Sequence, residues 1–415
     1  MIDEPSTVDG QRGGRVRARS AIGHYARLLT PDAVAAARLP LERDLPLRVA
    51  NAAQRAARRH RSERMRSLLA SPGGGLSWRS APKPGSPGPW GAVARPLAVA
   101  TCDVDRAMML GRTVFPLPLH LGHECAAEVV EVGTEVATVR PGDRVVVPFQ
   151  INCGHCLPCR RGHTGSCLSV PPTSMYGFGL AGGCWGGAIA DFMAVPFADA
   201  MLVKIPDAVT PAAAAGAADN ISDCYRQVAP HLPALLADDP DAEVLIVGRI
   251  ERRHPFTSSA VLFTALIARA LGARRVSVVD TWPALRERAE TLGFQFWDPR
   301  QPKLWPVAAL TVDATGSRDG LRNVLQHTAP DGICSSVWSL HRRVAVPLAA
   351  CYVRNVTLHI GRAHVRAVLP EVLDLMTCGQ FVPEQVTTNV ASIDDAPEAL
   401  RDHCFGDALK TVLIA

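Results

Sequence analysis

Four cysteines stand close together in the chain and restrict its folding more than any other feature. They have the spacing C-x2-C-x2-C-x7-C and are Cys153, Cys156, Cys159 and Cys167. Four thiolates complete a tetrahedral shell around zinc and leave no open position, as in structural zinc sites. Ferredoxin-type iron–sulfur runs have a shorter last gap followed by proline, whereas Leu168 follows here. With disulfide bonds as the other alternative, the spacing favours a lobe wrapped around structural zinc.

The composition is that of a folded globular protein with two or three domains: 415 residues, 47% hydrophobic and 20% charged. It excludes a disordered chain, a collagen-like fibre and a coiled coil. No apolar run reaches the roughly 18 residues that a membrane helix needs. The arginines near the N-terminus lead into no apolar segment of the kind that a secretory signal has. We therefore expect a cytoplasmic protein without a membrane partner.

Basic charge is concentrated in residues 1–64, which hold 13 arginines and 7 acidic residues, against 31 basic and 32 acidic residues in the rest. We interpret this segment as a poorly ordered extension, or as sequence translated upstream of the natural start, because the pattern changes at Met65. Short basic helices at 33–37 and 49–59 would instead form a nucleic-acid or membrane-surface arm. The main body gives no electrostatic reason to expect nucleic acid as a partner.

Hydrophobic periodicity after Met65 predicts two regions with different secondary structure. Short alternating runs between glycines and prolines predict strands of a β-rich domain, at 76–79, 92–100, 126–132, 143–147 and 189–195. From about residue 206, strands alternate with helices, which predicts βαβ units and a parallel sheet. The strands are expected at 243–247, 276–280 and 310–314, and the helices at 258–271 and 284–292.

A second metal constellation is less distinct. Cys102 ends a strand-like segment, and His123 follows twenty-one residues later, just before the next strand. A thiolate and an imidazole both suit zinc, and a catalytic zinc needs three protein ligands and one open position. Two residues alone are weak support, because a lone histidine is commonly a hydrogen-bonded core residue.

Several motifs occur together in one order: the run from Gly122-His123-Glu124 to Gly133, Pro141-Gly142-Asp143-Arg144-Val145, the four-cysteine lobe, Gly186-Gly187-Ala188, and Asp313 to Gly316. This series resembles the zinc-dependent medium-chain dehydrogenase/reductase superfamily over residues 65–415. The resemblance implies an α/β fold with two domains. A GroES-like catalytic domain would span 65–205 and be completed by 366–415, and a Rossmann dinucleotide-binding domain with a doubly wound parallel sheet would span 206–365.

The resemblance also implies roles for the second constellation. Cys102 and His123 would be ligands of a catalytic zinc, and Glu124 a carboxylate that holds or exchanges with the metal. The segment 218–225 resembles a run in glutathione-independent formaldehyde dehydrogenases and polyol dehydrogenases, which places Asp219 at the third ligand position.

Two neighbours of Asp219, namely Asp223 and Cys224, are competing ligands. A further departure lies two residues after Cys102, where the family usually has a serine or threonine that passes the alcohol proton outward. Val104 stands there, and valine cannot relay a proton. A water molecule, Asp103 or another group must do so, unless the chemistry differs.

The usual G-x-G-x-x-G dinucleotide fingerprint is altered. Gly248 follows the strand at 243–247, but Ser258 and Val261 occupy the later glycine positions, after about seven inserted residues. Two outcomes are open. Charged and hydroxyl groups could replace the glycine amides as donors, or the loop could block the pyrophosphate. The replacement donors would be Arg249, Arg252, Arg253 and the hydroxyls at 257–259.

Downstream residues complete the predicted cofactor site, which comprises Gly248, Ser258, Ser259, Asp280, Thr315 and Arg366. An acid at the end of the second strand, such as Asp280, binds ribose hydroxyls and favours NAD over NADP; its alternative role is a helix cap. Thr315 and Arg366 are assigned only through the resemblance, to the nicotinamide loop and a phosphate contact.

The predicted function is a zinc-dependent oxidoreductase that transfers a hydride between a small alcohol or aldehyde and NAD(P), with one catalytic and one structural zinc. The family implies a homodimer or homotetramer. The alternative is a zinc-binding homologue whose degenerate nucleotide loop leaves it inactive or a scaffold.

Overall fold

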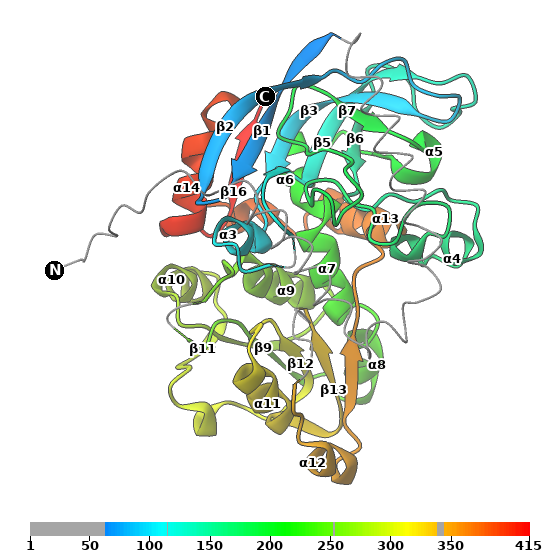
Figure 1. Ribbon diagram of the computed structural model, residues 1–415. Helices are drawn as coiled ribbons and strands as arrows, with labels where there is room; N and C mark the ends of the chain where they lie inside the picture. The colour runs from blue at the N-terminus through cyan, green and yellow to red at the C-terminus, as the bar shows by residue number, and fades with distance from the viewer. Residues whose placement is uncertain (1–62, 114, 252–253, 338–343) are drawn as a thin grey trace, which may run out of the picture. The chain divides into compact units, whose positions relative to one another are not determined.

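The computed structural model describes residues 63–113, 115–251, 254–337 and 344–415 (Figure 1). The chain divides into two units, 1–55 and 56–415, and the description below concerns the second. The predicted helices at 33–37 and 49–59, nearly all of the basic extension, and Arg252 and Arg253 lie outside the described residues.

Two largely antiparallel sheets form the β-rich part. The smaller sheet has the order β2-β1-β4: Gly75–Pro82, Arg64–Ser71 and Leu119–His120. The larger sheet has the order β15-β16-β3-β5-β6-β8, with β7 also paired to β3: Asn389–Ser392, Thr411–Ile414, Ala92–Ala100, Glu124–Val132, Arg144–Val147, Val203–Lys204 and Met193–Val195. Because β15 and β16 come from the end of the chain, the C-terminus completes this sheet.

Short helices surround these strands. They are α3 (Asp103–Met109), α4 (Leu157–Arg160), η1 (Thr164–Ser166), α5 (Ala198–Met201), η4 (Pro383–Gln385), η5 (Ile393–Asp395) and α14 (Ala396–Phe405). Helix α3 begins directly after β3, because the side chain of Asp105 accepts the backbone N–H of Cys102 at 2.8 Å and caps the first turn.

A six-stranded parallel sheet forms the second half. Its order is β11-β10-β9-β12-β13-β14: Gln295–Trp297, Arg275–Val279, Glu243–Val247, Ala308–Asp313, Thr328–Ser336 and Thr357–Ile360. Its helices are α9 (Ser259–Ala270), α10 (Pro283–Thr291), η3 (Pro302–Leu304), α11 (Arg318–Gln326) and α12 (Leu348–Val353). The strand order reverses between β9 and β12, which makes the carboxyl end of β9 the topological switch point at which such sheets bind ligands.

A helical segment joins the β-rich part to the parallel sheet. It consists of α6 (Pro211–Ala215), η2 (Gly216–Ala218), α7 (Asn220–Val228) and α8 (Leu232–Asp238), and α13 (Val365–Thr377) returns from the parallel sheet. Helix α7 packs against both α9 and α13, as Figure 1 shows. Asp219 lies between η2 and α7 with φ −151° and ψ −81°. Its backbone is therefore not helical, and the residue belongs to neither helix.

The predicted α/β class, with a GroES-like β-domain and a Rossmann sheet, is confirmed, and the strands at 92–100 and 243–247 are found with their predicted bounds. The strand predicted at 189–195 is wrong in extent, since β7 covers only its last three residues. Its first half bonds to two different segments, through Leu68 N to Ile189 O and Ile189 N to Leu121 O, instead of one ladder. The predicted domain boundaries stay predictions. Within the described residues, no helix combines the length and the apolar character that crossing a bilayer requires.

Candidate active site

The open metal constellation is assembled from three separate segments of the chain. Cys102 lies at the junction of β3 and α3, and His123 and Glu124 stand at the start of β5. Gly122, which precedes them, has φ +94°, and a Cβ there would lie 2.5 Å from the Ile189 backbone nitrogen. Glycine is therefore required at this turn, and it fixes where the histidine enters the site.

The candidate ligand atoms converge. Those of Cys102, His123, Glu124 and Asp219 all lie within 4.8 Å of one another. Asp219 Oδ2 is 3.5 Å from Cys102 Sγ and 3.2 Å from His123 Nε2. Zinc–ligand bonds of ordinary length give tetrahedral edges of about 3.4 Å. Glu124 Oε1 is buried without a hydrogen-bond partner among the described residues, so a cation fits this donor set.

The site concentrates negative charge in a buried place. Burial, together with nearby Asp219 and Glu124, raises the pKa of the Cys102 thiol well above its ordinary value. Burial also raises the pKa of Glu124 to about 7, against the lowering effect of Lys410. A bound divalent cation would instead lower the pKa of the Cys102 thiol, because a coordinating thiol is deprotonated outright.

Lys410 supplies a fixed positive charge beside these acids. Its Nζ lies 2.6 Å from Glu124 Oε2, and the two side chains are 2% and 0% exposed. Although burial lowers the pKa of Lys410, the fields of Glu124 and Cys102 outweigh burial and raise it. The ammonium therefore stays protonated, satisfies one Glu124 oxygen and leaves the other directed to the site.

Aromatic rings line the histidine. The Phe178 ring centroid is 4.8 Å from that of His123, and Phe149 is 6.0 Å away. On the opposite side, Asp105 Oδ1 faces His123 Nδ1 at 4.0 Å. This carboxylate favours the proton on Nδ1, which leaves the lone pair of Nε2 available to bind a metal on the side of Asp219.

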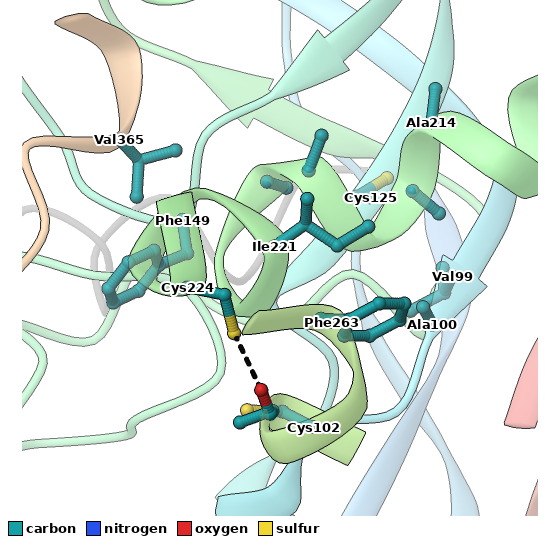
Figure 2. Close-up of a cluster of buried hydrophobic side chains, with 14 of the residues drawn as sticks. Val99, Ala100, Cys102, Cys125, Phe149, Ala214, Ile221, Cys224, Phe263 and Val365 are labelled. Atoms are coloured by element: carbon teal, nitrogen blue, oxygen red, sulfur yellow. Dashed lines mark hydrogen bonds between the residues drawn. The ribbon is translucent and has the colours of Figure 1, made fainter. Parts of the chain in front are cut away.

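The structure separates the three candidates for the third ligand. Asp223 accepts hydrogen bonds from Arg226 and Gln227 at 3.1 and 3.2 Å. The Cys224 thiol donates to the Ala260 carbonyl at 3.3 Å and belongs to the hydrophobic core (Figure 2). Asp219 joins the metal-ligand cluster, and Asp223 and Cys224 do not belong to it.

The four-cysteine cluster is also assembled, since its ligand atoms lie within 4.8 Å of one another. Backbone N–H groups point to its sulfurs: Cys156 N lies 3.4 Å from Cys153 Sγ, and Leu168 N lies 3.4 Å from Cys156 Sγ. Burial raises the pKa of Cys156, but hydrogen bonds from the backbone N–H groups of Leu168 and Cys159, together with those of the neighbouring thiols, outweigh it and lower the pKa to about 6. All twelve cysteines lie in the described residues and none of them forms a disulfide bond there, so the four sulfurs of the lobe are available to a metal.

The predicted nucleotide residues are only partly brought together. Gly248 follows β9, and a Cβ on it would lie 2.3 Å from Asp280 Oδ2 and 2.6 Å from Val261 Cγ2. The single glycine thus accommodates the valine that replaces the third glycine. Burial raises the pKa of Asp280 to about 6 against the effect of Arg249, and its oxygens already accept from the backbone N–H groups of Arg249 and Trp282.

Four further predicted residues of the nucleotide site lie in different surroundings. Ser259 opens α9, and its hydroxyl donates to Asp103 at 2.7 Å, while Ser258 is its buried N-cap residue. The Thr315 hydroxyl donates to Asp313 at 2.6 Å. Arg366 belongs to α13, where its Nε is buried without a hydrogen-bond partner among the described residues.

Sequence reasoning missed one functional residue, Lys410, and one contact, that of Asp103 with the N-terminus of α9. Lys410 had a signal, because a lysine inside the apolar C-terminal run 408–415 must either be paired or face solvent. The contact of Asp103 had none, since the backbone groups that it binds lie more than 150 residues away.

Comparisons with known proteins identify the family of the chain. Residues 89–207 match the alcohol dehydrogenase GroES-like domain. The chain is 33% identical over 370 residues to glutathione-independent formaldehyde dehydrogenase from Pseudomonas aeruginosa, covering 78% of this chain and 89% of that protein. Alcohol dehydrogenase TADH from Thermus sp. ATN1 superposes with a TM-score of 0.73 at 26% identity, covering 84% and 99%. Acetophenone reductase from Geotrichum candidum in complex with NAD shares the fold, with a TM-score of 0.68 at 21% identity, covering 86% and 98%.

A parallel sheet with a topological switch point, joined to a β-domain that carries the four-cysteine cluster and most of a second group of candidate metal ligands, defines an oxidoreductase of the alcohol dehydrogenase type. The chain belongs to the zinc-dependent medium-chain dehydrogenase/reductase family.

Proposed function

We propose that this protein oxidises a small alcohol or reduces the corresponding aldehyde at a zinc held by Cys102, His123 and Asp219. The observation that carries the proposal is the convergence of these donors, with Glu124, within 4.8 Å. Three protein ligands leave a fourth position for the substrate oxygen, whereas the four-cysteine cluster, proposed as the structural zinc site, leaves none.

When bound, the zinc supplies Lewis-acid polarisation of the alcohol or carbonyl oxygen. The chain's own residues set the conditions for that chemistry. Lys410 holds one oxygen of Glu124 at 2.6 Å, so that the other oxygen, Oε1, would be available to help hold the metal. Asp105 orients His123, and Phe149 and Phe178 shield it from water.

The hydride partner of this reaction class is a nicotinamide dinucleotide, and NAD is present in the related acetophenone reductase. In this chain the usual pyrophosphate position does not fit the cofactor as it stands, because the N-terminus of α9 is already hydrogen-bonded to Asp103. That observation favours a second candidate function, a zinc protein without dinucleotide turnover. The predicted cytoplasmic location and the predicted homodimer or homotetramer remain part of the proposal.

The test combines metal analysis with turnover. Purified protein should contain two zinc ions per chain and should oxidise members of a short-chain alcohol panel, or reduce the matching aldehydes, with NAD or NADP. Cys102→Ser should lose one zinc and the activity together. Two zinc ions without turnover of any panel member would favour the scaffold, and a single zinc in the wild-type chain would contradict the open site.

A further inference from the structure

A buried carboxylate occupies the N-terminus of helix α9. Asp103, which is 0% exposed, accepts the backbone N–H groups of Ser259 and Ala260, both at 2.9 Å. Its Oδ1 also accepts the hydroxyls of Thr257 at 2.6 Å and Ser259 at 2.7 Å. All four donors belong to the first turn of α9 or to the residues just before it.

These donors are the ones that a phosphate group uses. The first N–H groups of a helix have no partner within the helix, and together with the helix dipole they attract an anion. Helix α9 has twelve residues and follows β9, whose carboxyl end lies at the switch point of the parallel sheet. In this fold a dinucleotide places its pyrophosphate at that helix terminus.

Asp103 reaches this position from the other half of the molecule. It is the first residue of α3 and directly follows the candidate zinc ligand Cys102. Its backbone carbonyl accepts the N–H of Thr257 at 3.3 Å, so both its main chain and its side chain bind the segment before α9. The contact therefore joins the metal constellation to the nucleotide segment.

Side chains from the loop before α9 also fill the space beside Thr315 and Gly316. A Cβ on Gly316 would lie 2.9 Å from the Phe256 ring, and the imidazole of His254 contacts the Thr315 carbonyl oxygen. The loop that replaces the glycine-rich turn thus packs against the predicted nicotinamide loop.

We infer that Asp103 is an internal anion that takes the pyrophosphate position at α9 and sets the affinity of this chain for dinucleotides. A cofactor phosphate must displace the carboxylate, because two anions cannot share the same two N–H groups. The inference rests on the proposed function only in naming a dinucleotide as the ligand.

The experiment compares Asp103→Ala with the wild-type chain, using NADH fluorescence titration and thermal shift with inorganic pyrophosphate. Asp319→Asn is the matched control, since Asp319 is an exposed carboxylate in the first turn of α11, paired to Arg322 at 3.1 Å. We expect weak NADH binding by the wild type, with a Kd near or above ~1 mM, and at least about tenfold tighter binding by Asp103→Ala. Pyrophosphate should raise the melting temperature of Asp103→Ala only, and the control should match the wild type.

Asp103→Asn serves if the alanine variant does not fold, because the amide keeps an acceptor for Ser259 and removes the charge; its affinity should rise in the same direction. The inference is overturned if pyrophosphate stabilises the wild-type chain, if the wild type binds NADH at micromolar concentration, or if removing the charge leaves NADH affinity unchanged. Zinc analysis of the same samples separates the two proposals: two zinc ions in each would leave the metal site intact even where the inference about Asp103 fails.

Discussion

The two metal clusters are built in opposite ways. The four-cysteine cluster comes from one loop of fifteen residues, 153–167, and its sulfurs accept hydrogen bonds from that loop's own backbone. The open constellation draws its donors from residues 102, 123–124 and 219, and a lysine at position 410 completes its charge. Local construction gives a closed shell for stability, whereas donors held by separate elements can leave a vacancy for chemistry.

The largest expected effect tests whether the open constellation is a catalytic metal site. Asp219→Ala should remove one of the two zinc ions and lower kcat/KM by about a thousandfold or more, because the substrate oxygen loses its Lewis acid. Elemental analysis and steady-state kinetics measure both. Asp223→Ala, which changes a carboxylate bound to Arg226 and Gln227, is the control and should keep both metals. Two zinc ions in Asp219→Ala would show that the third ligand lies elsewhere.

Next in size is the loss of the closed shell. Cys156→Ser should release the other zinc and lower the free energy of unfolding by several kcal/mol, since metal binding to a structural site contributes to folding directly. Denaturant unfolding and zinc analysis check this, with Cys184→Ser as control because Cys184 is exposed and outside both clusters. A variant that loses the metal yet unfolds at the wild-type midpoint would contradict a structural role.

The same difference in construction explains what could be predicted from sequence. Spacing alone indicated the four-cysteine lobe, because all its ligands are local. The open constellation needed the family resemblance to connect Cys102 and His123 with Asp219. Hydrophobic periodicity gave the sheet class and the bounds of β3 and β9, but 189–195 was predicted too long because its partners change along the segment. The contact between Asp103 and α9 depends on how the two halves pack, which no local pattern encodes.

A third prediction concerns Lys410, the buried lysine that pairs with Glu124 in the open constellation. Lys410→Met should cost about 3–5 kcal/mol of stability, because it leaves Glu124 buried without its ion-pair partner. The double variant with Glu124→Gln should recover part of that loss, since the orphan charge is then removed. Chemical denaturation of the two single variants and the double variant measures the coupling. Equal losses in Lys410→Met and in the double variant would mean that the ammonium acts only through packing.

The smallest expected effect concerns proton transfer at the open site. Val104 is 5% exposed in the first turn of α3, where the family usually has a hydroxyl. While Oδ1 and Oδ2 of Asp103 accept hydrogen bonds from the α9 segment, this carboxylate is not available as the relay. A water molecule or another group must then carry the alcohol proton. Val104→Ser should therefore raise kcat for alcohol oxidation by about two- to tenfold, at the low end of general acid–base effects because that carrier already serves.

Val104→Ala is the matched control for that gain, since it removes the same methyl groups without adding a hydroxyl. Both variants should lose roughly 1–2 kcal/mol of stability from the smaller side chain, so the ratio of their kcat values isolates the hydroxyl. The gain in the serine variant should appear in kcat more than in KM, because a proton relay acts after the alcohol has bound. Equal kcat values for the serine and alanine variants would place the relay away from position 104. This protein would then differ from related dehydrogenases in the path of the alcohol proton as well as in the contact of Asp103 with the nucleotide-binding helix α9.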